Sequence, residues 1–252
     1  MADNIKTIQL RLGTVNQVSK ITKAMNLVAM SKIQKFQRNI KELSEITKDF
    51  DRFETETFEE TADAPTMAIC IASDLGLAAL YNRTLINEVK ELNPDYIYWI
   101  GKQSYDRLRK DDSVKVVNQI MTSDHLYLED FYDKVLSLMK NYRIKIAVPR
   151  MSGNEVAVTW RSLSQRLRQT DLIIYEPDYA TANQRYQEFY LYMTIYEAYY
   201  TSKFSENMVR RIAMETATDN ANEMREHLRN RFNQLRQEEI TQEILELSAG
   251  VE

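Results

Sequence analysis

The chain has 252 residues, of which 44% are apolar and 28% are charged, and its formal net charge is −4. This charge disfavours nucleic acid as the main partner, and the apolar fraction is sufficient for a folded core. No run of about 18 apolar residues could span a membrane, and the start of the chain lacks the apolar core of a signal peptide. The single cysteine, Cys70, excludes disulfides within the chain and fits a reducing cytosol.

Residues 1–64 predict one long helix, because they contain no proline and only one glycine. Their apolar residues recur in steps of three or four, as in the seam of a coiled coil. These residues are Ile5, Ile8, Leu12, Val15, Val18, Ile21, Met25, Val28, Ile33, Phe36, Ile40, Leu43, Ile46, Phe50 and Phe53. Residues 1–41 carry eight basic side chains and one acidic one. Such a block suits nucleic acid, an acidic protein collar or a solvated helix face.

Residues 65–178 predict a small α/β domain. All four prolines of the chain lie in this segment, and β-rich runs alternate with helical patterns, which favours a partly parallel sheet. The expected strands are 66–73, 96–100, 114–117, 144–148, 155–160 and 172–175. The expected helices are 79–92, 104–110 and 126–142. The runs on either side of residues 151–154 predict an antiparallel hairpin.

Residues 179–252 predict a second long helix, since they contain no proline and their only glycine is Gly250. Their apolar residues again form a stripe that needs a partner. The chain runs along the first helix, builds the α/β domain and returns along the second helix. We therefore expect an antiparallel coiled coil of the N- and C-terminal helices, flanking a small α/β, Rossmann-like domain. The tyrosines between residues 179 and 200 predict a packed aromatic seam.

The residue types give little support for catalysis. Phosphate-binding glycine motifs are absent, and neither His125 nor His227 has metal-ligand spacing to a second histidine or to Cys70. Asp74 follows the first expected strand of the α/β domain, where such folds place functional groups. An aspartate after a strand is also an ordinary helix cap, so this signal is weak.

Segments at both ends of the chain resemble the γ subunit of F1-type rotary ATPases. Residues 20–32, KITKAMNLVAMSK, are similar to that family's pattern K-I-T-x-A-M-x-x-V-A-x-x-K. Residues 212–220, 233–237 and 240–246 (IAMETATDN, NQLRQ and ITQEILE) resemble its C-terminal signature in order and spacing. Residues 73–82, SDLGLAALYN, match its S-D-x-G-L-C-G-x-x-N segment more loosely, with Ala78 and Ala79 replacing the Cys and the second Gly.

The resemblance implies a central rotary shaft that couples ATP hydrolysis or synthesis in a ring of α and β subunits to rotation. The implied chain is not itself an enzyme and binds no cofactor, because ATP, ADP and Mg²⁺ are held by the partner subunits. An ε-like subunit and a membrane rotor, or other foot proteins, are the further implied partners. The implied location is cytoplasmic, peripheral to the inner face of the cell membrane.

The resemblance also implies which residues contact the ring. These are Lys20, Lys23 and Met25 on the first helix and Asn233, Arg236, Gln237, Thr241 and Glu243 on the second. Arg236 and Gln237 match a polar pair that hydrogen-bonds a β-subunit loop, and the basic block faces an acidic loop of the same subunit. For Thr241 and Glu243, intrahelical pairing or plain solvent exposure is an equal alternative.

Three alternatives remain open at the level of sequence. The first is the shaft of an F1-like ATPase that is not a synthase, such as one in surface or gliding machinery, because residues 78 and 79 depart from the family pattern. The second is a coiled-coil adaptor that does not rotate. The third is an enzyme built on the α/β domain around Asp74.

Overall fold

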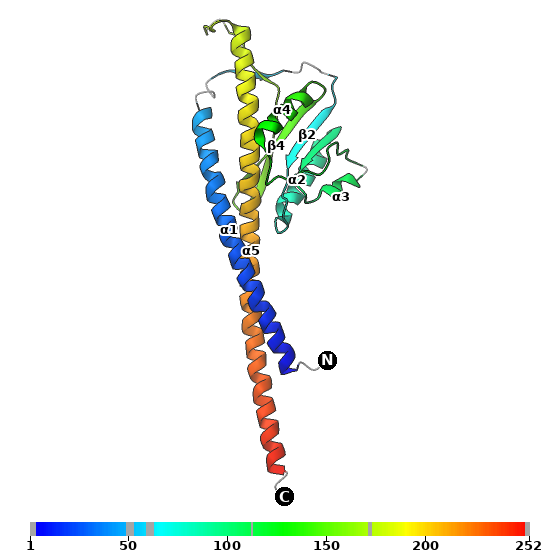
Figure 1. The fold of residues 1–252 in the computed structure, drawn as a ribbon, viewed down its shortest axis with the longest axis vertical. Coiled ribbons are helices and arrows are strands. Elements are labelled where there is room, and N and C mark those ends of the chain that lie inside the picture. Colours follow the sequence, from blue (N-terminus) through cyan, green and yellow to red (C-terminus); the bar gives the residue numbers. More distant parts are fainter. Residues whose placement is uncertain (1–3, 49–52, 59–62, 112, 171–172, 250–252) are drawn as a thin grey trace. The chain divides into compact units, whose positions relative to one another are not determined.

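The computed structural model describes residues 4–48, 53–58, 63–111, 113–170 and 173–249. The chain forms two compact units, Met1–Ala29 with Arg210–Glu252 and Met30–Val209. Two long helices run through both units, α1 (Ile5–Thr47) and α5 (Tyr179–Ala249) (Figure 1). The division into 1–64, 65–178 and 179–252 stays a prediction, although α5 begins at its expected residue.

Helix α1 ends at Thr47, so the expectation of a helix up to residue 64 is wrong. Thr55–Thr57 form strand β1 instead, which pairs antiparallel with β6 (Gln165–Leu167). Nine acidic side chains between residues 42 and 63 repel one another, and β-branched threonines favour a strand. The predicted helical residues 1–3, 49–52 and 59–62 lie outside the described part of the chain.

A four-stranded mixed sheet forms the centre of the unit Met30–Val209. Its order is β3-β2-β4-β5, with β2 parallel to β3 and β4, and β5 antiparallel to β4. The strands are β2 (Thr66–Ile71), β3 (Tyr96–Ile100), β4 (Arg143–Ser152) and β5 (Glu155–Ser162). The predicted hairpin is confirmed, and Gly153 supplies the positive φ of 62° that its tight turn requires.

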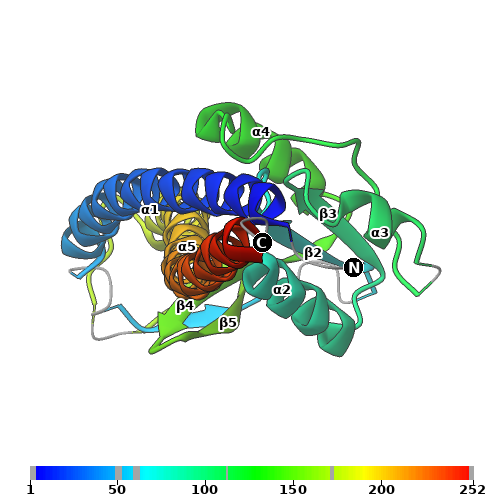
Figure 2. The same ribbon diagram turned by 90° about the horizontal axis from the view of Figure 1, so that it is seen from below.

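Helices cover both faces of this sheet, as Figure 2 shows for α2 and α4. On one face, α2 (Ala79–Leu92) packs Tyr81, Leu85 and Val89 against Cys70 and Ala72. The opposite face is covered by α4 (Leu128–Met139) and by α5, whose buried contributors are Phe131, Val135, Leu191 and Ile195. The short helix α3 (Tyr105–Arg109) follows β3. No helix in the described part is long and apolar enough to cross a membrane.

Two predicted strands do not form. Within residues 114–117 only Val116 makes a parallel bridge, to Ile97 of β3. Two residues further along, the side chain of Asn118 takes the place of backbone hydrogen bonds to β3. The Trp99 N–H donates to Asn118 Oδ1 at 2.9 Å, and Asn118 Nδ2 donates to the Trp99 carbonyl at 2.7 Å. In 172–175, Leu172 lies outside the described residues and 173–175 have no strand partner.

Candidate partner-contact surface

Helices α1 and α5 run in opposite directions within each unit. In the unit Met1–Ala29 with Arg210–Glu252, Thr22 Oγ1 lies 2.6 Å from Thr218 Oγ1, and Ser19 Oγ donates to Asn222 Oδ1 at 3.4 Å. Residue numbers fall along α5 as they rise along α1. The predicted antiparallel pairing of the two helices is therefore confirmed there.

The residues that close this seam differ from those expected. The buried positions of α1 in this unit are Ile8, Val15, Ser19, Thr22 and Ala29, which keep the spacing of seven, four and three of a coiled coil. Val18, Ile21 and Val28 were expected in the seam but are exposed, and Met25 is half-buried. Small side chains let the two helix backbones approach closely, and the hydroxyl groups hydrogen-bond to side chains across the seam. A prediction from apolar spacing alone selects the neighbouring aliphatic residues instead.

The shifted seam leaves an apolar stripe on a flank of α1, about 110° around the helix from the seam. Leu10, Val18, Ile21 and Val28 follow one another in steps of eight, three and seven, which keeps them within about 80° of one another around the helix. Their exposed fractions are 68%, 43%, 58% and 59%. We call these four residues the outer stripe. Exposed apolar residues that gather on one face of a helix mark a candidate site of protein contact.

The predicted contact residues on α1 separate into two groups. Lys20 and Lys23 are exposed and lie three residues apart, so they share one face of the helix. Met25 points to a different side, about 140° from Lys20, and is half-buried. The structure thus brings the two lysines together but not the methionine.

Beyond the start of α1, helix α5 continues without a partner in the described part of the chain. The pairing of Thr22 with Thr218 places the first turn of α1 opposite the turn that contains Arg236. Every described side chain from Arg236 to Glu246 is exposed, including Ile240 and Ile244. We call residues 236–246 the α5 tip.

The predicted contact residues on α5 lie on one broad face of this helix. Asn233, Arg236, Gln237, Thr241 and Glu243 are all exposed and span about 160° around the axis, with Ile240 and Ile244 between them. Thr241 Oγ1 donates to the Gln237 carbonyl at 2.8 Å, so its proton is engaged inside the helix. The face therefore presents hydrogen-bonding side chains around an apolar centre.

Asp74 has a structural explanation in the α/β domain. Its carboxylate accepts a hydrogen bond from the Lys102 N–H at 3.1 Å and one from the Asp124 N–H at 2.7 Å. It therefore ties together two loops at the carboxyl end of the parallel strands. No group of three or more possible metal ligands occurs among the residues that the structure describes.

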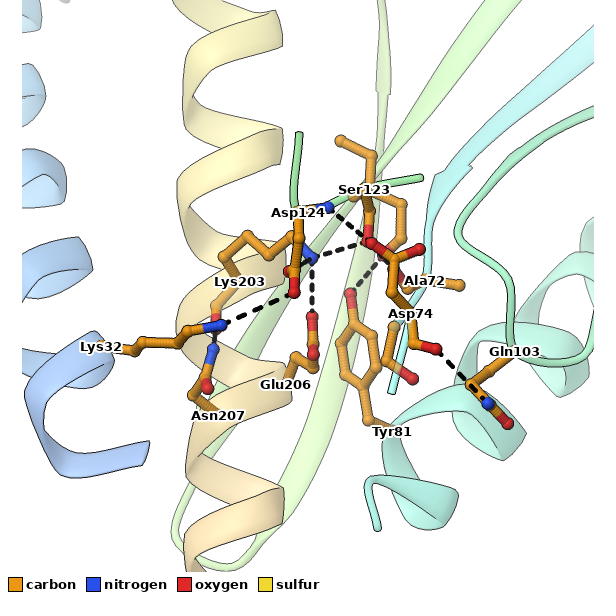
Figure 3. Close-up of polar contacts among 12 residues, drawn as sticks. Lys32, Ala72, Asp74, Tyr81, Gln103, Ser123, Asp124, Lys203, Glu206 and Asn207 are labelled. Carbon is orange, nitrogen blue, oxygen red and sulfur yellow. Dashed lines mark hydrogen bonds and ion pairs between the residues drawn. The ribbon is translucent and has the colours of Figure 1, made fainter. Parts of the chain in front are cut away.

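A polar cluster that the sequence reasoning missed lies beside these loops (Figure 3). The ammonium group of Lys203 on α5 is buried and donates to Ser123 Oγ, Asp124 Oδ1 and Glu206 Oε2, at 2.6, 2.6 and 3.0 Å. Lys32 on α1 lies 3.6 Å from the other oxygen of Asp124. The available sequence signal was the pair of opposite charges at Lys203 and Glu206, three residues apart in a helical pattern.

The cysteine, the histidines and the tyrosines have structural explanations. Cys70 is fully buried, and this burial raises the pKa of its thiol. His125 and His227 are exposed. The tyrosines of α5 form the expected aromatic seam, in which Tyr192 and Tyr196 stack with ring centroids 4.2 Å apart.

Comparisons with known proteins agree with this architecture. A family model described as ATP synthase matches residues 4–252. The ATP synthase gamma chain of Mycoplasma mobile is 30% identical to this chain over 98% of each sequence. The chain belongs to the ATP synthase gamma-chain family. The gamma chain of Christiangramia forsetii is 29% identical and covers 99% of this chain and 98% of its own length.

The gamma-chain fold is also found among solved structures. A chain in the cryo-EM structure of the Euglena gracilis mitochondrial ATP synthase (OSCP/F1/c-ring, rotational state 3) has a TM-score of 0.71. It is 17% identical and covers 98% of this chain and 93% of its own length. At this identity the likeness establishes the shared fold. The resemblance drawn from the sequence motifs is confirmed.

Proposed function

We propose that this gamma-family chain is the central rotary shaft of an F1-type ATPase, coupling ATP hydrolysis or synthesis in a ring of α and β subunits to rotation. The observation that carries the proposal is the exposed apolar surface of the two helices, made of the outer stripe and of Ile240 and Ile244 in the α5 tip, which no described part of the chain covers. A two-helix hairpin in water gains nothing from such a surface, but a shaft enclosed by a ring buries it.

The polar residues around this surface supply the contacts that change as the shaft turns. Arg236 and Gln237 are exposed neighbours on the tip, where a guanidinium and an amide can bind the oxygens of a β-subunit loop. Lys20 and Lys23 present two positive charges on one face of α1 to an acidic loop. Complementary charge of this kind mainly tunes orientation and rate.

The chain's own role in this proposal is mechanical and requires no cofactor. Nucleotide and Mg²⁺ bind the ring subunits, and an ε-like subunit and a membrane rotor attach to the α/β domain. The complex then lies at the inner face of the cell membrane. An F1-like motor that is not a synthase uses the same shaft with other proteins at the foot, but no observed feature favours it.

The test is reconstitution of the full chain with the α and β subunits of its own complex. Changing Arg236 and Gln237 together to alanine is expected to lower steady-state ATPase activity at least about tenfold, the equivalent of about 1.4 kcal/mol in the activation barrier. Gln184→Ala is the matched control, because Gln184 is an exposed glutamine of the same helix that lies outside the α5 tip.

Unchanged activity in the double variant would favour the non-rotary adaptor. ATPase activity of the purified chain alone, lost on Asp74→Asn, would favour the enzyme reading. Identifying the proteins that copurify with the native complex separates the two rotary possibilities. A proton-conducting ring with a stator indicates a synthase, and other foot proteins indicate a specialised motor.

A further inference from the structure

A large cavity lies within the unit Met30–Val209, away from the surfaces discussed above. Its volume is about 1000 Å³, which is at the upper end of the range for small-molecule sites. The cavity is bounded by the start of β4, the end of β5, the β1–β6 ribbon and the C-terminal end of α4. It is therefore built from rigid elements that converge from four parts of the chain.

The charge of the cavity lining is of one sign. Lys140, Arg143, Lys145 and Arg161 line it, and no aspartate or glutamate occurs among its described lining residues. In a chain with a net charge of −4, basic groups thus outnumber acidic ones among the described residues that line this cavity. A local excess of positive charge concentrates anions.

Two of these cations have no counter-ion among the described residues. Lys140 is exposed and Lys145 is half-buried, and neither forms an ion pair there. Lys145 lies on the central strand β4 with Ala68 and Ser162 as its cross-strand neighbours, so it has no acidic neighbour in the sheet. Both ammonium groups can therefore bind an anion without first breaking an ion pair to a described residue.

The two arginines are anchored rather than mobile. Arg143 Nε donates to the Ala64 carbonyl at 2.8 Å, which fixes its guanidinium at the cavity wall. Arg161 and Arg150 share the single carboxylate of Glu197, at 3.1 and 2.6 Å, so this group of three keeps one positive charge. Anchored guanidinium groups bind phosphate oxygens with little loss of conformational entropy.

The rest of the lining suits a ligand larger than a single phosphate. Thr66, Ser162 and Ser164 supply hydroxyl groups, and Tyr142, Trp160 and Tyr190 supply aromatic walls. Hydroxyl donors bind phosphate oxygens, and flat aromatic surfaces bind a base or an apolar ligand body. The lining thus combines the two kinds of contact that a phosphorylated organic molecule needs.

We propose that this cavity binds a phosphate-bearing anion of about the size of a nucleotide. Lys145 and Lys140 contribute the charge that the fold leaves uncompensated, and Arg143 and Arg161 contribute fixed donors. The phosphate groups belong either to a free soluble ligand or to the headgroup of an anionic lipid. This site does not depend on the rotary role, since none of its residues lies on the outer stripe or the α5 tip.

The test uses the intrinsic fluorescence of the full chain. Of its two tryptophans, Trp99 is fully buried and Trp160 lines the cavity, so an occupied site changes the Trp160 signal. Pyrophosphate and ATP are titrated as soluble probes. Vesicles of phosphatidylglycerol, compared with phosphatidylcholine, are the membrane probe, read out by cosedimentation.

Saturable binding of at least one probe is expected, with the dissociation constant raised at least about tenfold in Lys140→Gln/Lys145→Gln. Lys134→Gln, an exposed lysine of α4 outside the cavity lining, should change it less than about twofold. Binding of the soluble probes identifies a free ligand, and binding of anionic vesicles alone identifies a lipid headgroup. If the double variant does not fold, Lys140→Gln alone serves, because Lys140 is exposed.

Two results would overturn the proposal. One is the absence of saturable binding of pyrophosphate, ATP and anionic vesicles. The other is binding that is equally strong in the wild type and in the folded double variant, which would place the anion elsewhere on the chain. Neither result bears on the ATPase test of the shaft, so failure of one proposal can be told from failure of the other.

Discussion

The ammonium nitrogen of Lys203 lies 2.6 Å from Oδ1 of Asp124 and 3.0 Å from Oε2 of Glu206, with only 1% of the lysine side chain exposed. All three donors of the ammonium group are used, since Ser123 accepts the third. Ser123 in turn donates to the Ala72 carbonyl at 2.7 Å, just beyond the end of β2. A single buried cation thus joins α5 to the carboxyl end of the sheet, the place where α/β folds commonly bind ligands.

Lys203→Met should be strongly destabilising. Removing the cation takes away the ammonium group that neutralises the buried carboxylate of Glu206 and binds Oδ1 of Asp124, and breaking a buried ion pair of this kind typically costs about 3–5 kcal/mol. The measurement is the free energy of unfolding in urea. Lys41→Met, an exposed lysine on α1, is the control and should change it by less than about 0.5 kcal/mol.

A second variant separates charge from packing at this cluster. Adding Glu206→Gln to Lys203→Met removes the buried negative charge that Lys203 neutralises in the native chain and should recover part of the lost stability. If the double variant is as unstable as the sum of the two single variants, the cluster acts through packing and the ion-pair interpretation is wrong.

The position of the seam on α1 can be tested with two isoleucines. Ile8 is fully buried between α1 and α5, so Ile8→Ala should destabilise the hairpin by about 2–5 kcal/mol. Ile21 lies on the outer stripe, and Ile21→Ala should change the free energy of unfolding of the isolated chain by less than about 0.5 kcal/mol. Thermal unfolding followed by circular dichroism measures both variants. Equal losses of stability would show that Ile21 also lies in the seam, as the apolar pattern predicts.

Tyr199 should make the protein less stable at alkaline pH. Burial, with a further contribution from the Asp124 carboxylate, raises the pKa of Tyr199 from 10.0 to about 12. Between these values the unfolded chain loses the phenolic proton and the folded chain keeps it, so stability falls as the pH rises from 10 to about 12. Below pH 10 the phenol is neutral in both states and contributes no pH dependence.

Tyr199→Phe should therefore make the loss of stability between pH 10 and 12 less steep. The measurement is the urea midpoint at several pH values across this range. Tyr127→Phe is the control, because Tyr127 is 77% exposed and should leave the steepness unchanged. Identical profiles for wild type and Tyr199→Phe would contradict the prediction.

Cys70 should be protected from thiol reagents in the native chain. It is fully buried in β2, and burial raises the pKa of its thiol, so little reactive thiolate is present near neutral pH. Reaction with a disulfide reagent should be at least about a hundredfold slower than in denaturant, because it requires opening of the sheet. Rapid labelling of the folded chain would show that β2 is accessible.

The sequence by itself determined the two long helices, the α/β domain, its hairpin and the family. The two long helices contain no proline and, apart from Gly13, no glycine, and the residues of each motif are contiguous in the chain. Local pattern is sufficient where backbone propensity and periodicity point the same way. The sequence motif also selected Arg236 and Gln237 as a ring contact, which stays a prediction.

Only the tertiary structure decided which side chains face one another. Ser19 and Thr22 close the seam in place of Val18 and Ile21 because hydroxyl pairing across two close helices depends on the partner helix. The strand predicted at residues 114–117 does not form, and the side-chain amide of Asn118 hydrogen-bonds to the backbone of β3 beside it. The Lys203 cluster and the cationic cavity join residues far apart in sequence, and hydrophobic periodicity carries no information about such contacts.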